Sequence, residues 1–240
     1  MSNFFRNFPI ITYTFGNETD RVLFENISVY IKIIDKLKDN IAFYETEFIN
    51  DFERPDTLSN KLYGTTDYYW TFYYLNNDVR ESGWPLAELE IQEKLKADYP
   101  HRTIVTQTPI ASAIKVGDTV VGQTSGSTGT VIKKFIDLGQ VVVKCPDNFA
   151  VGELVVPNNR IADTITVSSE GVQYDSVHHY ENSSGEYVDI DPLSPSLGGL
   201  TPITYSNRVY AKNDALRELK VMKPNVATQV QAEYNRLLKG

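Results

Sequence analysis

Residues 52–77 read FERPDTLSNKLYGTTDYYWTFYYLNN, and this stretch decides the fold of the N-terminal part of the chain. Arg54-Pro55 has the character of a helix start, because proline is favoured in the first turn. Leu58 and Leu62 then recur one turn apart on one face. Gly64 predicts the end of the helix, since glycine tolerates the left-handed conformation that follows a last helical turn.

A second helix is predicted over residues 67–76, with Thr65 or Thr66 as its cap. Six of the seven residues from Tyr68 to Tyr74 are aromatic. With 3.6 residues per turn, these side chains occupy two adjacent faces of the helix. One face carries Tyr69, Phe72 and Tyr73, and the other carries Trp70 and Tyr74. The aromatic band is wider than one core-facing stripe requires, so part of it is left for a ligand, a nucleic acid or another protein.

Composition narrows these choices. The chain has 240 residues and a formal net charge of -8, which disfavours non-specific binding to phosphate backbones. The basic residues nearest the aromatic run, Lys61 and Arg80, have acidic neighbours, so base stacking in a positive groove is not expected. Cys145 is the single cysteine, and no signal peptide or membrane-spanning stretch is expected. We therefore expect a protein of a reducing cytoplasm, with no membrane or nucleic-acid partner.

The remaining chain changes character twice. Alternation predicts strands at 26–33 and at 42–49, and Gly83-Trp84-Pro85 predicts a turn before a helix over 86–98. Short β-type runs punctuated by glycine follow from Thr103 to Ser168, namely TIVTQT, DTVVGQ, TVIKKFI, QVVVK and ELVVP. The glycines from Gly122 to Gly129 precede a strand-like sequence, so they predict a hairpin loop and not a phosphate loop.

The C-terminal third is predicted to be a loop followed by a helical arm. Residues 171–200 are polar and rich in Ser, Gly and Pro, which favours a long loop. Residues 213–238 are predicted to be helical with a break at Pro224. In the second part of this helix Val226, Val230, Tyr234 and Leu237 share one face, which could pack on its own domain or dock on another chain.

Candidate catalytic and metal-ligating residues are few. His178 and His179 are neighbours, so in an extended segment they should point apart, and no metal site or cofactor is expected. Asp189 and Asp191 could share one face of an extended segment, but solvated loop acids are the favoured interpretation. No acid–base pair or nucleophile motif points to an enzyme. A cell-wall hydrolase is a third class that we considered, and clearing of a turbid cell-wall suspension by the purified protein would be evidence for it.

The ordered set from Arg54 to Gly64, then the aromatics, then Leu75-Asn76, resembles a LysM module. That family has a β–α–α–β plan, and in secreted proteins it binds polymers of N-acetylglucosamine. In this sequence no closing strand of the usual kind follows Asn77 directly.

A larger part of the chain, roughly residues 20–100 and 205–240, resembles the LysM-like baseplate wedge subunit of contractile-tailed bacteriophages. The resemblance is carried by residues 45–76, by Gly83-Trp84-Pro85-Leu86 and by the segment from Asn213 to Pro224. It implies a structural virion protein of the tail baseplate, assembled in the host cytoplasm. Its partners would be other wedge proteins and the neighbouring wedges of a six-fold ring. The β-rich 103–170 piece looks like an insertion.

The sequence thus predicts an α+β protein of three parts. These are a LysM-like domain with N-terminal strands (1–102), a small all-β inserted module (103–170) and a loop with a C-terminal helical arm (171–240). The residues expected to contact partners are Tyr68, Trp70, Tyr74, Trp84, Val226, Val230, Tyr234 and Leu237. The residues expected to form the scaffold are Leu58, Leu62, Tyr63, Gly64 and Leu75. A peptidoglycan-binding module of a phage tail is the alternative function.

Overall fold

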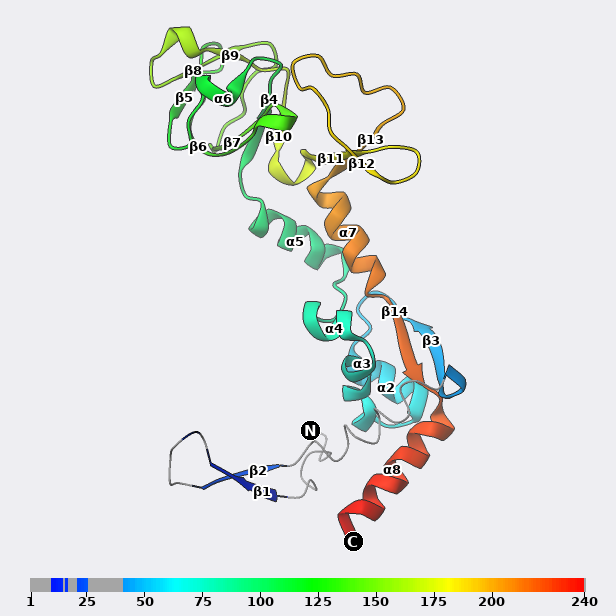
Figure 1. Cartoon of the computed structure of the whole chain (residues 1–240). Coiled ribbons are helices and arrows are strands. Elements are labelled where there is room, and N and C mark those ends of the chain that lie inside the picture. Colours follow the sequence, from blue (N-terminus) through cyan, green and yellow to red (C-terminus); the bar gives the residue numbers. More distant parts are fainter. Residues whose placement is uncertain (1–9, 15, 17–20, 26–40, 240) are drawn as a thin grey trace. The chain divides into compact units, whose positions relative to one another are not determined.

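The computed structural model describes residues 10–14, 16, 21–25 and 41–239. The protein is a mixed α and β chain with several sheets and, within these residues, seven α-helices (Figure 1). It divides into two compact units. Unit 1 comprises Met1–Ala87 and Asn213–Gly240, and unit 2 comprises Glu88–Lys212. This division differs from the predicted three parts, because the second unit is inserted into the first and contains more than the β-rich piece. The predicted strand at 26–33 lies outside the described residues.

Unit 1 is built on two antiparallel strands that are far apart in the sequence. β3 (Tyr44–Phe48) pairs with β14 (Glu218–Met222), from Phe48 opposite Glu218 to Tyr44 opposite Met222. Between them in the sequence come α2 (Pro55–Tyr63), α3 (Trp70–Leu75) and α4 (Asn77–Ser82), followed by the inserted unit. Figure 1 shows β3 beside β14, with α2 and α3 against the strand pair. The order in unit 1 is therefore β3, α2, α3 and α4, and then β14 after the insertion.

The first predicted helix is confirmed at both ends. Arg54 is extended and Pro55 opens α2, while Gly64 adopts the left-handed conformation with φ 71°. The Gly64 N–H donates to the carbonyl oxygen of Asn60 at 2.9 Å, so a carbonyl of the last turn is satisfied. Thr65 caps the following 3₁₀ turn, Thr66–Tyr68, as its side chain accepts from the Asp67 N–H at 3.3 Å.

The prediction of a helix beginning at Asn213 is wrong for the segment before Pro224. Helix α7 (Tyr205–Ala215) is followed by strand β14 and then by α8 (Pro224–Lys239). Leu219 and Val221 are completely buried in the second cluster, while Met222 is buried in the first cluster and Lys220 is partly exposed, so successive side chains point to opposite faces as in a strand. Packing against Leu58 and Phe72 buries these two side chains, and each contributes about 1.5–3 kcal/mol.

Two clusters of buried side chains form the core of unit 1. The first consists of Tyr44, Leu75, Met222, Val226, Ala227 and Val230. The second consists of Ile49, Leu58, Phe72, Val79, Leu216, Leu219 and Val221. Tyr63 packs against both clusters, and its hydroxyl donates to the carbonyl oxygen of Met222 at 3.0 Å. The helix pair and the strand pair are thus joined into one hydrophobic core.

A separate two-stranded hairpin precedes this core in the sequence. β1 (Ile10–Tyr13) pairs antiparallel with β2 (Val22–Glu25). Tyr13 lies across from Val22, and the Tyr13 ring makes an edge contact with Phe24 at 6.5 Å.

Unit 2 contains a seven-stranded antiparallel sheet in the order β10-β4-β7-β6-β5-β8-β9. All five predicted β-type runs are strands of this sheet, namely β4 (Arg102–Val105), β5 (Thr119–Gly122), β6 (Thr128–Phe135), β7 (Gln140–Lys144) and β8 (Leu154–Pro157). The remaining two are β9 (Ile165–Thr166) and β10 (Ser169–Val172). The connection from β5 to β6 is a hairpin, as the glycines predicted. One buried cluster, which includes Ile104, Val131 and Cys145, fills the interior.

Buried charges fix the loops of this sheet. Glu153 is 4% exposed, and its carboxylate accepts from the backbone N–H groups of Thr124 and Ser125 at 3.0 and 2.9 Å. Burial by itself raises the pKa of Glu153, but these hydrogen bonds outweigh it and the pKa is lowered. The carboxylate of Asp118 accepts from Arg160 at 2.8 Å in a second pairing of the same kind. Both groups hold connections between strands in place.

The predicted long loop at 171–200 is wrong over much of its length. β11 (Val177–Glu181), β12 (Tyr187–Val188) and β13 (Thr201–Thr204) form a three-stranded sheet, and only the segment between β12 and β13 is a long connection. The polar composition concealed these strands, because none of the residues of β11 is fully buried. The predicted helix over 86–98 is confirmed as α5 (Glu88–Asp98), and a short α6 (Ile110–Ala113) follows β4.

Candidate partner interface

The aromatic run is divided between the core and the surface. Phe72 on α3 is completely buried, and its ring lies 6.2 Å from that of Tyr63 and 6.1 Å from that of Trp84. Thr71 beside it is also buried, and its hydroxyl donates to the carbonyl oxygen of Tyr68 at 2.7 Å. These contacts orient α3 so that Phe72 faces the scaffold residue Leu58, which belongs to the same cluster.

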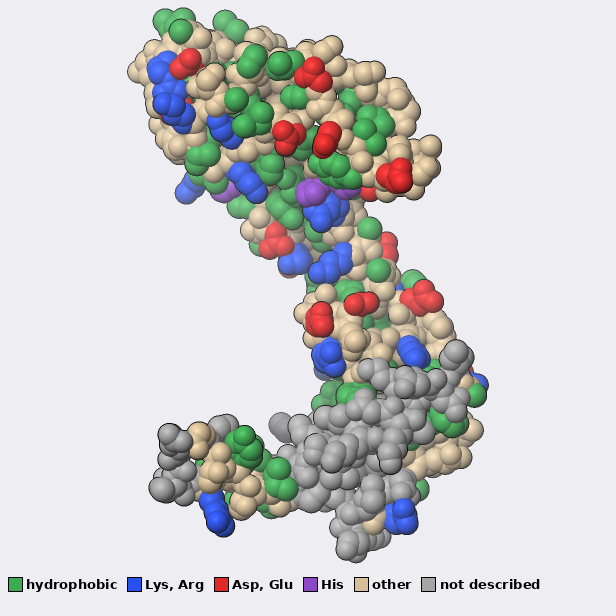
Figure 2. Space-filling view, viewed as in Figure 1, with side chains coloured by type: hydrophobic (Ala, Val, Ile, Leu, Met, Phe, Trp, Pro, Cys, Tyr) green, Lys and Arg blue, Asp and Glu red, His purple; other side chains and the backbone are tan. Residues whose placement is uncertain are grey.

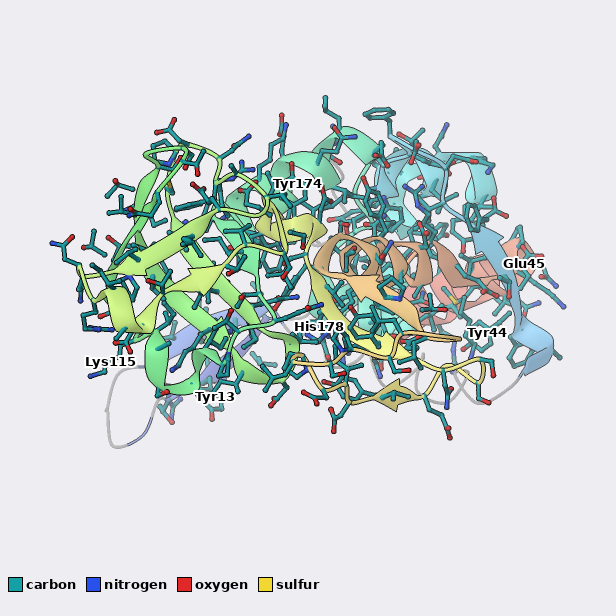
Figure 3. All side chains as sticks on the ribbon, turned by 90° about the horizontal axis from the view of Figure 1, so that it is seen from above. Tyr13, Tyr44, Glu45, Lys115, Tyr174 and His178 are labelled. Atoms are coloured by element: carbon teal, nitrogen blue, oxygen red, sulfur yellow. The ribbon has the colours of Figure 1, made fainter. Side chains whose placement is uncertain are left out.

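Tyr68, Trp70 and Tyr74 are half-buried and lie at the margin of the core. Trp70 and Tyr74 pack against the first cluster, which contains Tyr44 on β3 (Figure 3). The ring of Tyr68 makes an edge contact with Tyr63 at 5.3 Å, and partial burial raises the pKa of its hydroxyl. Each of the three residues is thus fixed on one side by its own unit while part of its surface is accessible.

Trp84 has a different position from the other three predicted partner residues. Its indole N–H donates to the carbonyl oxygen of Glu53 at 2.7 Å. Its ring packs against the second cluster and lies 5.9 Å from the ring of Tyr73. The structure therefore gives Trp84 a role in joining the segment after α4 to the segment before α2.

The predicted docking face of the C-terminal helix is directed into unit 1. Val226 is 5% exposed and Val230 is 3% exposed, and both belong to the first cluster together with Met222. We therefore leave these two residues out of the accessible surface, because α8 closes its own core with them. Tyr234 and Leu237 lie on the same helix, but their side chains are outside the described residues.

Two asparagines that sequence reasoning did not select bind distant backbone. The Asn76 side chain donates to the carbonyl oxygen of Lys220 at 2.9 Å and accepts from its N–H at 2.9 Å. The Asn213 side chain accepts from the N–H of Leu86 at 2.7 Å and donates to its carbonyl oxygen at 3.1 Å. The signal for the first was the Leu75-Asn76 pair itself, while a lone Asn213 carries no comparable signal.

A shallow hollow lies on unit 1 next to the Asn76 contact. It measures about 370 Å³ and is lined by residues of β3 and β14, including Thr46 and Glu218. The ammonium group of Lys220 lies 4.3 Å from the centre of the Tyr44 ring on this side of the sheet. The hollow combines charged and aromatic surface, as contact regions between proteins often do.

The two adjacent histidines do not point apart as predicted. Their Nδ1 atoms are 3.0 Å from each other, and His178 lies on β11 beside α7 (Figure 3). The reason is a register shift in the pairing of β11 with β13 between Val177 and His179. Such a bulge places two successive residues opposite one partner residue and disturbs the alternation of side chains.

Metal and membrane features were also sought in the described part of the chain. Within it, no three His, Cys, Asp or Glu side chains come together as a metal site. None of its helices is long and apolar enough to cross a bilayer. Asp189 and Asp191 lie in the connection between β12 and β13, where the Asp191 carboxylate accepts from the N–H of Leu193 at 3.0 Å.

No protein-family model matches the chain, and no curated protein matches it.

Proposed function

We propose that the protein is a structural component of a contractile bacteriophage tail, where it joins the proteins of a baseplate wedge and bridges neighbouring wedges. The proposal rests on the resemblance carried by residues 45–76, 83–86 and 213–224. The pairing of β3 with β14, on either side of α2, α3 and α4, supports it, because β14 would supply the closing strand of a LysM-like plan that is missing directly after Asn77. The insertion of unit 2 agrees with a family plan to which a module has been added.

The partly exposed rings of Tyr68, Trp70 and Tyr74 are the main support for a protein partner. Tyrosine and tryptophan bring a large apolar area together with a polar group, and they lose little side-chain freedom on binding. The three side chains are already held by packing and ring contacts within unit 1. Such pre-ordered aromatics are typical of binding hot spots, where truncation to alanine costs about 2 kcal/mol or more.

Assembly of tail complexes tests the proposal. The double variant Tyr68→Ala/Tyr74→Ala should fold, yet it should be lost from complexes that contain the other wedge proteins, because the accessible aromatic area is removed. Co-purification from phage-infected cells, followed by identification of the bound proteins and their stoichiometry, measures this. Phe52→Ala is the matched control, since Phe52 is 77% exposed on the same unit and belongs to none of the proposed contacts. Normal assembly of the double variant would refute the aromatic interface.

A LysM-type glycan-binding module is the second candidate, because the same half-exposed Tyr and Trp rings could stack on sugar rings. The two candidates differ in what the purified protein binds alone. Titration with chitin oligomers and sedimentation with peptidoglycan should show no binding if the wedge proposal is right. Saturable sugar binding that Tyr74→Ala abolishes would favour the glycan-binding function instead.

A further inference from the structure

Unit 2 contains an open apolar groove that the proposed function does not use. Its volume is about 350 Å³, and its apolar lining comes from three separate segments, with Pro109 and Ile110 at the start of α6, Ile136 after β6, and Ile190, Pro192 and Leu193 between β12 and β13. Ile136 and Leu193 remain 48% and 49% exposed, so an occupant could still remove much apolar surface from water.

The walls of this groove are held in fixed positions. Gly139 has φ 60°, and a Cβ atom added there would lie 2.3 Å from the carbonyl oxygen of Thr106 and 3.1 Å from the Cβ of Pro192. The loop before β13 therefore packs directly on the turn between β6 and β7. The Asp191 carboxylate accepts from the N–H of Leu193, which stabilises the same loop locally. A groove with fixed walls loses little conformational entropy when an occupant binds.

The charged groups at the groove are acidic. Asp137 and Asp191 both line it, and both residues are exposed to solvent. Lys134 does not line the groove, although its ammonium group donates to the carbonyl oxygens of the lining residue Ala111 and of Ile114 at 2.7 and 2.8 Å. Figure 2 shows both acidic and basic side chains among hydrophobic ones on the visible face of this unit. An apolar floor with two carboxylates complements an apolar segment that carries positive charge.

We propose that this groove binds an extended segment of a partner protein in which aliphatic side chains or proline are flanked by Lys or Arg. The apolar side chains would lie against Ile136, Pro192 and Leu193, and the basic residues would pair with Asp137 and Asp191. Exposed ion pairs add little to affinity, so apolar contact supplies most of the affinity and charge supplies the selectivity. A single short peptide is expected to bind weakly, with a Kd of about 1 mM or somewhat below.

Nuclear magnetic resonance titration of the full chain tests the groove with the peptide Gly-Lys-Leu-Pro-Leu-Lys-Gly, blocked at both ends. The peptide should shift the amide signals of Ala111, Ile136 and Leu193. A matched peptide with Glu in place of both Lys residues should bind about tenfold more weakly, as should one with Ser in place of both Leu residues. Added salt should weaken the binding of the Lys peptide.

Two variants and one control locate the binding. Ile136→Ser should weaken the Lys peptide about fivefold or more, and Asp137→Lys should remove the preference for the Lys peptide over the Glu peptide. Asp147→Lys should leave both affinities unchanged, because Asp147 is exposed and does not line the groove. Equal binding of the Lys and Glu peptides, or shifts confined to other residues, would overturn the proposal. Self-association that Ile136→Ser abolishes would also overturn it, since the occupant would then be a second copy of the chain.

This inference is independent of the aromatic interface in unit 1. The variant Tyr68→Ala/Tyr74→Ala should still bind the Lys peptide, because the groove lies entirely in unit 2. Failure of the peptide titration therefore leaves the wedge proposal standing, and failure of tail assembly leaves the groove standing.

Discussion

The side-chain amide of Asn76 forms two backbone hydrogen bonds with Lys220, at 2.9 Å to its carbonyl oxygen and at 2.9 Å from its N–H. An asparagine side chain has the same donor and acceptor groups as a peptide unit, so Asn76 occupies the edge of β14 as a further strand would. Its Nδ2 also donates to the carbonyl oxygen of Phe72 at 2.8 Å, which ties the end of α3 to the same edge. A single side chain thus links two segments separated by the whole inserted unit.

Replacing Asn76 with leucine should destabilise unit 1 strongly. The change leaves the N–H and carbonyl oxygen of Lys220 without these partners, and each unsatisfied buried group costs about 1–3 kcal/mol. We expect the free energy of unfolding to fall by about 2–4 kcal/mol, measured by urea denaturation. Asn77→Leu is the control, since Asn77 is exposed at the start of α4 and should change stability by less than about 0.5 kcal/mol. Equal effects of the two changes would show that the Lys220 contacts are not stabilising.

Replacing Trp84 with phenylalanine should affect folding and leave partner binding intact. The variant loses the 2.7 Å hydrogen bond to the carbonyl oxygen of Glu53, and a smaller ring packs beside Phe72 and Tyr73. A loss of about 1–3 kcal/mol is expected in urea denaturation. The folded variant should still enter tail complexes. A variant of unchanged stability that fails to assemble would instead place Trp84 at a partner surface, as the sequence alone suggested.

The histidine pair of unit 2 should make its stability depend on pH. Arg208 can only donate, so its 2.5 Å contact makes Nε2 of His178 an acceptor and leaves the proton of the neutral ring on Nδ1. That proton is donated to Nδ1 of His179, whose Nε2–H then donates to the carboxylate of Glu181 at 2.9 Å. The chain of hydrogen bonds requires both rings to be neutral. Nitrogen chemical shifts should therefore show the two rings as opposite tautomers at neutral pH.

Burial, and then the positive charge of Arg208, lower the pKa of His178 from its ordinary value of 6.5. Because the folded-state pKa lies below the unfolded-state value, the stabilising contribution is complete above pH 6.5 and is lost as the pH falls through the folded-state pKa. The midpoint temperature of thermal unfolding of the wild-type protein should fall as the pH is lowered below 6.5. His178→Gln should remove this part of the pH dependence. His101→Gln is the control. A wild-type profile that matches that of His178→Gln would contradict the hydrogen-bond chain.

Local signals in the sequence were sufficient for much of the fold. Pro55 and Gly64 mark α2, and the glycine-punctuated runs after Thr103 mark the strands of unit 2. These elements depend mainly on turn chemistry and on hydrophobic period within a few residues. The residues of β14 were misinterpreted because Leu216 and Leu219 also fit a helical spacing, and only pairing with the distant β3 selects the strand.

The candidate site was predictable only in part for the same reason. The aromatic run predicted more aromatic side chains than the core can bury, so that some of them stay accessible. The burial of Phe72 beside the partly exposed Tyr68 and Tyr74 agrees with that prediction. Whether Trp84 faces solvent or the protein depends on Glu53, 31 positions earlier in the chain, which no local pattern encodes. The bulge at His178 likewise arises from pairing with β13 and has no sequence signal of its own.

The paired hydrogen bonds between Asn213 and Leu86 have a consequence for how this chain could have arisen. They hold the two ends of the first unit within bonding distance at the point where the polypeptide departs for 125 residues and comes back. A graft at that junction needs no new packing in the host, since donor and recipient each keep their own hydrophobic interior. An ancestral protein that gained, lost or exchanged unit 2 would then change what it attaches to, while the fold of unit 1 stays the same.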